Sequence, residues 1–415
     1  MADFLNIFGS ILLIAAGIGV LISFFREKPE PDILKKHKKN KTIAKIPGSN
    51  KIDFSKWIWI GLIALCARWL IYLIGYRTIE SDSSFWEQII KVFSVSGDSP
   101  HYLYLAEHGY TAVGDKANLI VFYPLYPLCI RIFNVFFNNY LLSSVVVSNL
   151  AFMASCCIFY ELLRLDYTKE QSISGVALML AAPFTMFYSA VFTESVFLLT
   201  TLLCLYFLRT KKPVWMAVSG FLACLSRTQG VLLFVCALVV VARDLFQQRK
   251  FNAKLLLWSL LIPVGFFVYL LMNQMLFGNW FQYLEFQAAA PWYNKAQWFG
   301  KTLSYSYDMA HSYPGLANFI YRPQLILFFI GTLTIFLGIF KKVRTEYLVY
   351  LGAYIFTCYT HGWLISGSRY MCACIPLYIV FASVKNKYVR YGIIAISLVV
   401  CLFYTGLWLR GESIM

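Results

Sequence analysis

The chain has 415 residues, of which 60% are hydrophobic, 18% aromatic and only 13% charged, and it carries a formal net charge of +16. Soluble domains carry about a quarter charged residues, so this composition excludes a soluble protein and predicts a multi-pass helical membrane protein. The basic excess is typical of cytoplasmic loops and of contact with anionic lipid headgroups, so we expect the membrane, and no nucleic acid, as a partner.

The chain begins with an apolar segment, residues 4–25, which lacks a basic start and a small-residue cleavage site. We therefore expect a retained extra membrane helix over residues 1–25 rather than a signal peptide. Residues 26–56 contain the run KKHKKNK and are expected to form a basic cytoplasmic linker. Residues 57–415 are predicted to form one membrane domain, because no polar stretch within them is long enough for a separate soluble domain.

Apolar runs recur along the whole chain and predict an all-α, polytopic fold with about twelve membrane helices. Several runs are too short to span a bilayer without their flanks. The runs cover residues 4–25, 57–76, 140–163, 173–190, 191–208, 213–226, 230–242, 255–277, 323–340, 347–365, 370–384 and 391–409.

Residues 96–127 are the most informative stretch and read SGDSPHYLYLAEHGYTAVGDKANLIVFYPLYP. Asp98 stands two residues before Pro100, a pattern typical of a helix start in which Asp98 or Ser99 caps the first turn. A functional interpretation is the alternative, because a helix from Pro100 brings His101 and Tyr102 within about one turn of Asp98. A carboxylate, an imidazole and a phenol at a helix N-terminus suit an anionic ligand or a proton transfer.

The prolines of FYPLYP, Pro124 and Pro127, prevent this aromatic run from continuing as a regular helix. We expect residues 119–137 to form an interfacial or re-entrant segment rather than a full crossing. If the basic linker lies in the cytoplasm and residues 119–137 do not cross the membrane, the other basic connections also lie on the cytoplasmic side. Five polar features then share the non-cytoplasmic side: Asp98, Thr193–Glu194–Ser195, Ser226–Gly230, the loop 278–322 and Ser368–Arg369–Tyr370.

Ionisable residues at membrane depth are functional candidates, and Glu194, Arg227 and Arg369 each stand between apolar runs. Taken singly, each has an equally good interpretation as an interface residue or a structural ion pair, but their common side favours one site. A carboxylate above arginines suits the transfer of a sugar from a lipid-linked phosphosugar. The carboxylate takes the proton of the acceptor hydroxyl, and an arginine holds the leaving phosphate.

A monophosphate leaving group makes less demand for a metal than a nucleotide diphosphate does, and we expect neither a metal nor another cofactor. The nearest acidic motif is Glu80–Ser81–Asp82, for which a metal site is the less favoured interpretation. The 11 cysteines lie in apolar segments without a CxxC pair and are interpreted as core residues. The aromatic stretch 278–299 fits a belt at the headgroup level better than a surface that stacks on a sugar.

An ordered set of motifs makes a family resemblance specific: GDSPHYLYLAEHGY, FYPLYP, FTESVF, LSRTQG and GSRYMCACIPLY. Between residues 57 and 384 the chain resembles the GPI mannosyltransferase 2 family, which adds the second mannose in GPI-anchor synthesis, and its bacterial mannosyltransferase relatives. These proteins belong to the GT-C superfamily of membrane glycosyltransferases. The resemblance implies a GT-C-like membrane domain with external juxtamembrane loops and a mannosyltransferase activity.

Carried onto this sequence, the resemblance makes Asp98 the catalytic base. It implies substrate-binding roles at the other matching positions, which are His101, Tyr102, Tyr123, Tyr126, Glu194, Arg227, Gln229, Arg369 and Tyr370. Two positions depart from the family pattern, since Gly97 stands where tryptophan is common and RTQG replaces RSNG. These departures bear on the identity of the sugar more than on the reaction class.

Eukaryotic members of this family use dolichyl-phosphate mannose as donor and a GPI precursor as acceptor. The compact loops and the composition of this chain resemble the bacterial branch more closely. This implies an undecaprenyl-type phosphosugar donor, a glycan or glycolipid acceptor and the bacterial plasma membrane, with the endoplasmic reticulum membrane as the alternative; no partner subunit is assigned. A secondary transporter and a noncatalytic scaffold are the competing functions, although the two halves show no repeat of the kind that many transporters have.

Overall fold

The computed structural model describes residues 1–27 and 54–414, so nearly all of the linker expected at residues 26–56 lies outside the described residues. The described residues form helices joined by turns and loops, with one isolated bridge between Ala296 and His361. The first half contains α1 (Ala2–Arg26), α3 (Phe54–Arg77), α4 (Phe85–Val95), α5 (Ser99–His108), η1 (Asp115–Val121), α6 (Leu125–Phe137), α7 (Tyr140–Arg164), α8 (Lys169–Ala181), η2 (Thr185–Tyr188) and α9 (Glu194–Arg209).

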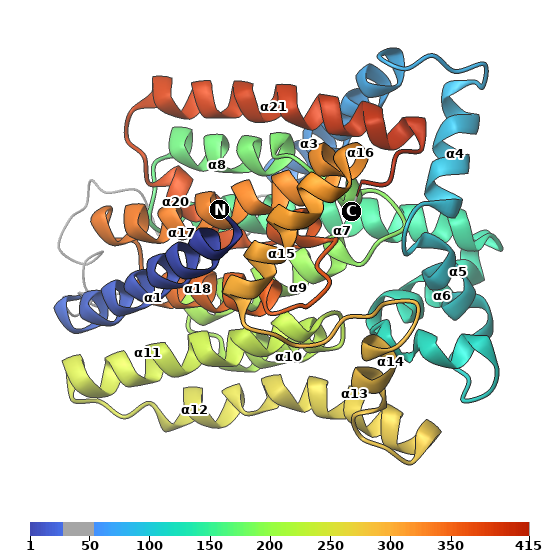
Figure 1. The fold of residues 1–415 in the computed structure, drawn as a ribbon. Coiled ribbons are helices and arrows are strands. Elements are labelled where there is room, and N and C mark those ends of the chain that lie inside the picture. Colours follow the sequence, from blue (N-terminus) through green and yellow to red (C-terminus); the bar gives the residue numbers. More distant parts are fainter. Residues whose placement is uncertain (28–53, 415) are drawn as a thin grey trace.

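The second half begins with α10 and ends with α21, which packs back against α3 and α8. In Figure 1, α21 and α8 run along one edge of the molecule, α11 and α12 along the opposite edge, and α4, α5 and α6 close one end. The elements are α10 (Pro213–Cys224), η3 (Thr228–Val231), α11 (Leu232–Gln248), α12 (Ala253–Ser259), α13 (Leu261–Phe277), α14 (Gln282–Ala288), α15 (Phe299–Ser312), α16 (Pro314–Leu316), η4 (Ala317–Tyr321), α17 (Arg322–Phe340), α18 (Thr345–Tyr359), α19 (Gly367–Cys372), α20 (Ile375–Ala382) and α21 (Lys387–Arg410).

The polytopic, all-helical architecture predicted from composition is confirmed. Within the described residues, seven helices are long and apolar enough to cross a membrane, so the expected count of about twelve is not confirmed. The remaining apolar runs form shorter helices, such as α9 with 16 residues, α10 with 12 and α20 with 8. Two of these short helices start with a proline in the first turn: Pro213 begins α10, and Pro376 is the second residue of α20. The seven helices are Ala2–Arg26, Ser55–Arg77, Tyr140–Arg164, Thr228–Gln248, Ala253–Phe277, Pro314–Phe340 and Lys387–Arg410.

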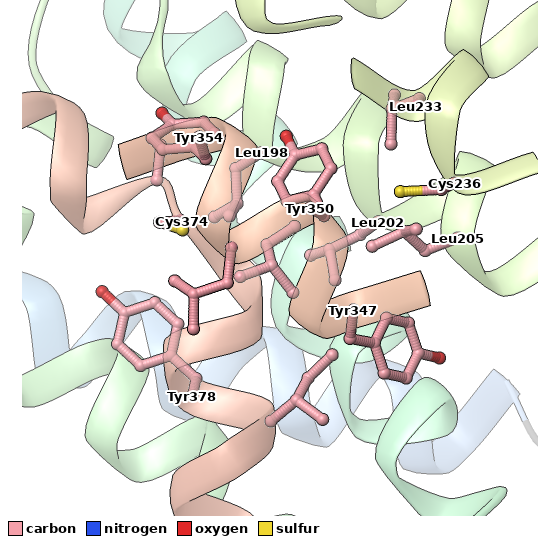
Figure 2. Packing of buried hydrophobic residues seen from close by; sticks show 14 of the residues in the cluster. Leu198, Leu202, Leu205, Leu233, Cys236, Tyr347, Tyr350, Tyr354, Cys374 and Tyr378 are labelled. Atoms are coloured by element: carbon pink, nitrogen blue, oxygen red, sulfur yellow. The ribbon is translucent and has the colours of Figure 1, made fainter. Parts of the chain in front are cut away.

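The short helix α9 lies at the centre of the protein. It packs between α7, α10 and α11 and is buried around most of its circumference, as expected for a helix that is hydrophobic on all sides. Figure 2 shows Leu198, Leu202 and Leu205 of this helix gathered with Tyr347 and Tyr350 of α18 in the main core. A short helix therefore suffices here, because protein rather than lipid surrounds it.

A second apolar cluster packs α3, α4, α5 and α21 around η2, and Tyr72, Phe93, Phe187 and Trp408 are among its large buried members. Val196 of α9 belongs to this second cluster, whereas its neighbour Phe197 belongs to the main core. The first turn of α9 therefore lies at the junction of the two cores. The candidate site is built at this junction.

Candidate active site

Asp98 stands at the N-terminus of α5, as its spacing from Pro100 predicted, but it does not cap the helix. The helix starts at Ser99, and the Asp98 side chain makes no capping hydrogen bond. Its Oδ2 atom instead lies 2.7 Å from Nη1 of Arg369, and 23% of the side chain is exposed. The capping interpretation is therefore wrong in its geometry, because the carboxylate of Asp98 points to a distant element.

Arg369, in α19, joins Asp98 to a buried ion-pair network. Its Nε lies 3.2 Å from Oε1 of Glu194, and the same oxygen lies 2.7 Å from Nη1 of Arg227. The Glu194 side chain is only 1% exposed. The order of charges is Asp98, Arg369, Glu194, Arg227, so two carboxylates balance two guanidinium groups. This balance makes the burial tolerable, since an unpaired charge at the same depth is very costly.

Aromatic rings enclose the two arginines. The guanidinium carbon of Arg369 lies 5.1 Å from the ring centroid of Phe192, and that of Arg227 lies 4.6 Å from the ring centroid of Tyr370. Phe187 lies 5.8 Å from Arg369 on the side of η2. Rings at these distances favour a cation and exclude water from its faces. The arginines are thus held at fixed positions by carboxylates at one end and aromatic faces on the sides.

The turn before η3 positions Arg227. A Cβ atom at Gly230 would lie 2.5 Å from the backbone of Ala223 and Cys224, so only glycine lets this turn close against the end of α10. Arg227 itself has an extended backbone, and its amide donates to the Ala223 carbonyl at 3.1 Å. The glycine of the RTQG motif is therefore needed for the close backbone approach that orients the arginine.

His101 and Tyr102 continue the site along α5. The His101 ring lies 5.1 Å from Phe122 and 6.5 Å from Trp292. Trp292 lies in the connection between α14 and α15, because residues 278–322 are largely helical rather than the long loop that was expected. Burial lowers the pKa of His101 below its ordinary value, despite the opposing charge of Asp98. Tyr102 is buried, and its ring meets the rings of Phe122 and Tyr126 edge-on at 5.1 Å. A neutral imidazole thus lies near Asp98 beside an aromatic wall.

The FYPLYP segment packs against the turn that carries Arg227. The Leu125 amide donates to the carbonyl of Leu225 at 3.0 Å, and the hydroxyl groups of Tyr123 and Thr228 lie 2.7 Å apart. The helix that follows, α6, has 13 residues and is about 20 Å long, which is too short for a bilayer core of about 30 Å. Pro124 immediately precedes α6, in agreement with the expected break, but Pro127 lies in the first turn of the helix and does not interrupt it. The re-entrant path in a membrane stays a prediction.

The side-chain hydrogen bonds of Tyr126 and Gln229, two of the predicted substrate-binding residues, are directed away from the charged network. The hydroxyl group of Tyr126 lies 2.8 Å from Ser148 Oγ on α7, and the residue is fully buried. The Gln229 amide faces the Cys358 sulfur at 3.8 Å. Both residues pack elements together around the site, and the structure gives neither of them a contact with Asp98, Glu194 or the arginines among the residues that it describes.

Several buried polar atoms around the network have no hydrogen-bond partner among the described residues. They include the hydroxyl groups of Thr193, Ser195, Ser226 and Ser368, which flank the charged residues in sequence, and Oε2 of Glu194. Nε and Nη1 of Arg369 belong to the same set, because they lie at ion-pair distance from the carboxylates without hydrogen-bond geometry. Buried polar groups are nearly always paired in folded proteins. The site therefore has unused capacity to bind polar groups of water or of a substrate.

The sequence reasoning missed His361 and the phenylalanines beside Arg369. Nδ1 of His361 lies 2.9 Å from Nδ2 of Asn294, and its ring lies 6.3 Å from that of Tyr370. Burial and the charge of Arg227 lower the pKa of His361 to about 4. The sequence offered one indication of its role: His361 is one of only five histidines in the chain and stands eight residues before Arg369.

Glu80 and Asp82, the acidic pair considered for a metal, lie in an exposed turn between α3 and α4. Over residues 1–27 and 54–414, no three side chains of His, Cys, Asp or Glu are grouped as metal ligands would be.

Comparison with solved structures identifies the architecture. The crystal structure of an oligosaccharyltransferase from the archaeon Archaeoglobus fulgidus, in the apo form, superimposes with a TM-score of 0.51 over 86% of this chain at 11% identity. The fold is GT-C-like. The chain spans 56% of the length of that structure, and at this identity the likeness concerns the fold alone.

An oligosaccharyltransferase structure from the same archaeon, in complex with an inhibitory peptide and a dolichol-phosphate, superimposes less well. Its TM-score is 0.46 at 10% identity, over 86% of this chain and 56% of that one. No family model and no curated protein matches the sequence. The chain is thus a multi-pass membrane protein with a GT-C-like fold.

Proposed function

We propose that this protein is a membrane glycosyltransferase that moves a sugar, mannose by family resemblance, from a polyprenyl-phosphate donor to an acceptor hydroxyl. The observation that carries the proposal is the network of Asp98, Arg369, Glu194 and Arg227. Its outermost carboxylate is partly exposed, and the charges behind it are almost completely buried. A reactive carboxylate backed by fixed arginines is the arrangement that transfer from a phosphosugar needs.

Asp98 is the proposed general base. The acceptor oxygen forms a bond to the anomeric carbon, and its proton passes to the Asp98 carboxylate. The bond between the anomeric carbon and the phosphate oxygen breaks, and its electron pair stays with the phosphate. The ion pair with Arg369 uses Oδ2 of Asp98. Oδ1 accepts no hydrogen bond from the described residues and is the atom that we assign to the acceptor proton.

Arg227 and Arg369 are proposed to hold the phosphate as it leaves with increased negative charge. A guanidinium group has five N–H donors. The ion pairs engage one nitrogen of Arg227 and two of Arg369. The remaining donors are available to phosphate oxygens, to which arginine binds with paired, charge-assisted hydrogen bonds. Glu194 keeps the two guanidinium groups together against their mutual repulsion.

His101, Tyr102 and Tyr370 are proposed to bind the sugar or the acceptor beside the network. His101 forms part of an aromatic wall with Phe122 and Trp292, and such a wall suits the apolar face of a sugar ring. Residues 57–415 are proposed to be the catalytic domain. The donor is proposed to be an undecaprenyl-type phosphosugar, the acceptor a glycan or glycolipid, and the location the bacterial plasma membrane.

The test uses the purified full chain in detergent with radiolabelled polyprenyl-phosphate mannose and a panel of glycan and glycolipid acceptors. Transfer of label to an acceptor, without any ion gradient, is the expected result. The same donor carrying glucose gives slower transfer if the enzyme is specific for mannose. The competing transporter function is tested in liposomes. Gradient-dependent uptake of a solute, without any transfer of label to an acceptor, would identify a transporter and contradict the proposal.

A further inference from the structure

A second polar region lies at the far end of α9 from Glu194. It surrounds a cavity of about 660 Å³ that is lined by the C-terminal ends of α9 and α11 and by the residues at the starts of α10, α12 and α18. Since α9 has 16 residues, about 24 Å separates this end from the Asp98 network. The cavity is therefore separate from the candidate active site.

Positive charge dominates the lining of the cavity. Seven lysines and arginines line it, against only two carboxylates, Asp244 and Glu346. Two further carboxylates, Asp166 and Glu27, do not line the cavity themselves but form ion pairs with Arg209 and Arg243. Counting these two as well still leaves an excess of three positive charges. Lys211 and Lys212 come from the turn between α9 and α10, and Lys250 and Lys254 from the connection between α11 and α12.

Two of the cations are buried and fixed in position. Nη1 and Nη2 of Arg209 bind the two carboxylate oxygens of Asp166 at 2.5 and 2.9 Å, and Nη1 also donates to the Tyr347 hydroxyl at 3.1 Å. Arg243 binds Glu346 at 2.7 Å and Glu27 at 3.4 Å. Arg209 and Arg243 are only 8% and 6% exposed. Charged groups held in this way are typical of binding sites, because their side chains lose little entropy when a ligand arrives.

The fixed arginines keep donors for a further anion. Among the described residues, every hydrogen bond of Arg243 starts from Nη1, so its Nε and Nη2 donors are not used by them. A guanidinium group that is already oriented matches the oxygens of a phosphate better than a flexible ammonium group does. The four lysines add further positive charge to the lining of the cavity.

Part of the cavity wall is apolar. Phe207, Val240, Phe251 and Leu255 contribute to it. Next to it on α11 and α12, the large apolar side chains of Phe246 and Leu257 are exposed, as lipid-facing residues are. A ligand with a phosphate group and an adjoining apolar part therefore complements both sides of the cavity.

We propose that this cavity is a binding site for a phosphate-bearing ligand, either the headgroup of an anionic lipid or a soluble phosphate compound. The proposal does not depend on the glycosyl transfer proposed above. If Asp98 faces the outside, the cavity faces the cytoplasm, where anionic lipids and phosphate compounds are both abundant.

The test titrates the purified full chain with phosphatidylglycerol, phosphatidylcholine or inorganic pyrophosphate and follows binding by native mass spectrometry. The variant is Lys250→Gln/Lys254→Gln, whose exposed lysines line the cavity and take no part in the fixed ion pairs. The control is Lys341→Gln/Lys342→Gln, which loses the same charge from exposed positions that do not line the cavity. Both variants are expected to fold like the wild type.

We expect phosphatidylglycerol or pyrophosphate to bind the wild type more tightly than phosphatidylcholine does. The Lys250/Lys254 variant should bind phosphatidylglycerol or pyrophosphate about tenfold or more weakly than the wild type, since it loses charge-assisted hydrogen bonds to the phosphate. If the Lys250/Lys254 variant loses affinity for phosphatidylglycerol alone, the cavity binds a lipid headgroup. If it loses affinity for pyrophosphate, the cavity binds a soluble phosphate compound. If the cavity variant and the control bind every probe equally, the proposal is overturned.

Discussion

Replacing Glu194 by glutamine should cost the protein much of its stability, because it removes the central charge of the buried network. The same Glu194 oxygen contacts Arg227 at 2.7 Å and Arg369 at 3.2 Å, and the side chain is 1% exposed. Glutamine keeps the shape but leaves two buried guanidinium groups with Asp98 as their remaining partner in the network. Breaking a buried ion pair in this way costs about 3–5 kcal/mol.

The same change at Asp98 should cost much less. Its side chain is 23% exposed, and Arg369 keeps Glu194 when Asp98 becomes asparagine. A partly exposed pair contributes about 1 kcal/mol or less. With an unfolding entropy of about 2.1 cal/mol/K per residue over this length, each kcal/mol moves the melting temperature by about 1 °C. Glu194→Gln should thus lower it by about 3–6 °C, and Asp98→Asn by about 1 °C or less.

Thermal unfolding of the purified variants in one detergent, followed by intrinsic fluorescence, measures both values. Glu107→Gln is the matched control, since it makes the same chemical change on a side chain that is 53% exposed. Equal losses for Glu194→Gln and Asp98→Asn would refute the reasoning, because they would show that Asp98 is as structural as Glu194. A Glu194 variant as stable as the wild type would show that the ion pairs contribute nothing measurable.

Three further predictions address the arginines, the glycine turn and the missed histidine. Arg227→Lys and Arg369→Lys should each lower donor turnover in well-folded protein, because lysine keeps the charge but loses the planar fork; unchanged kinetics in both would make these arginines merely structural. Gly230→Ala should lower activity by displacing Arg227, whereas Gly315→Ala, where a Cβ meets open space, should not. The pKa of His361 is lowered from 6.5 to about 4, so the stability linked to its neutral form is complete above pH 6.5 and is lost as the pH falls towards 4. The melting temperature should therefore fall over that range, and by less in His361→Gln.

The sequence indicated which charged residues come together better than it indicated their contacts. The common side of Asp98, Glu194, Arg227 and Arg369 followed from the positions of the basic connections, and the structure brings these four residues together. The sequence did not predict that Arg369 bridges Asp98 and Glu194, because this contact depends on how α5, α9 and α19 meet in space. The capping pattern at Asp98 misled for the same reason, since a local motif does not reveal a competing distant partner.

Side-chain direction was equally hidden from the sequence. Tyr123 and Tyr126 stand three residues apart in one motif, yet the hydroxyl group of the first bonds the Arg227 turn and that of the second bonds α7. The number of membrane helices was also overestimated from the apolar runs, because a run such as α9 is short and is surrounded by protein. Hydropathy reports burial without distinguishing lipid from protein as the surroundings.

The most direct test of the account is the single-turnover rate of sugar transfer by Asp98→Asn, compared with the wild type and with Asp115→Asn. Asp115 is an exposed aspartate in the same stretch, residues 96–127, so it controls for the chemical change itself. Asparagine preserves the shape of Asp98 and removes the proton acceptor, so the rate should fall by at least about 100-fold while Asp115→Asn transfers normally. If the Asp98 variant melts like the wild type and transfers sugar at a similar rate, Asp98 is not the base and the proposed mechanism is wrong.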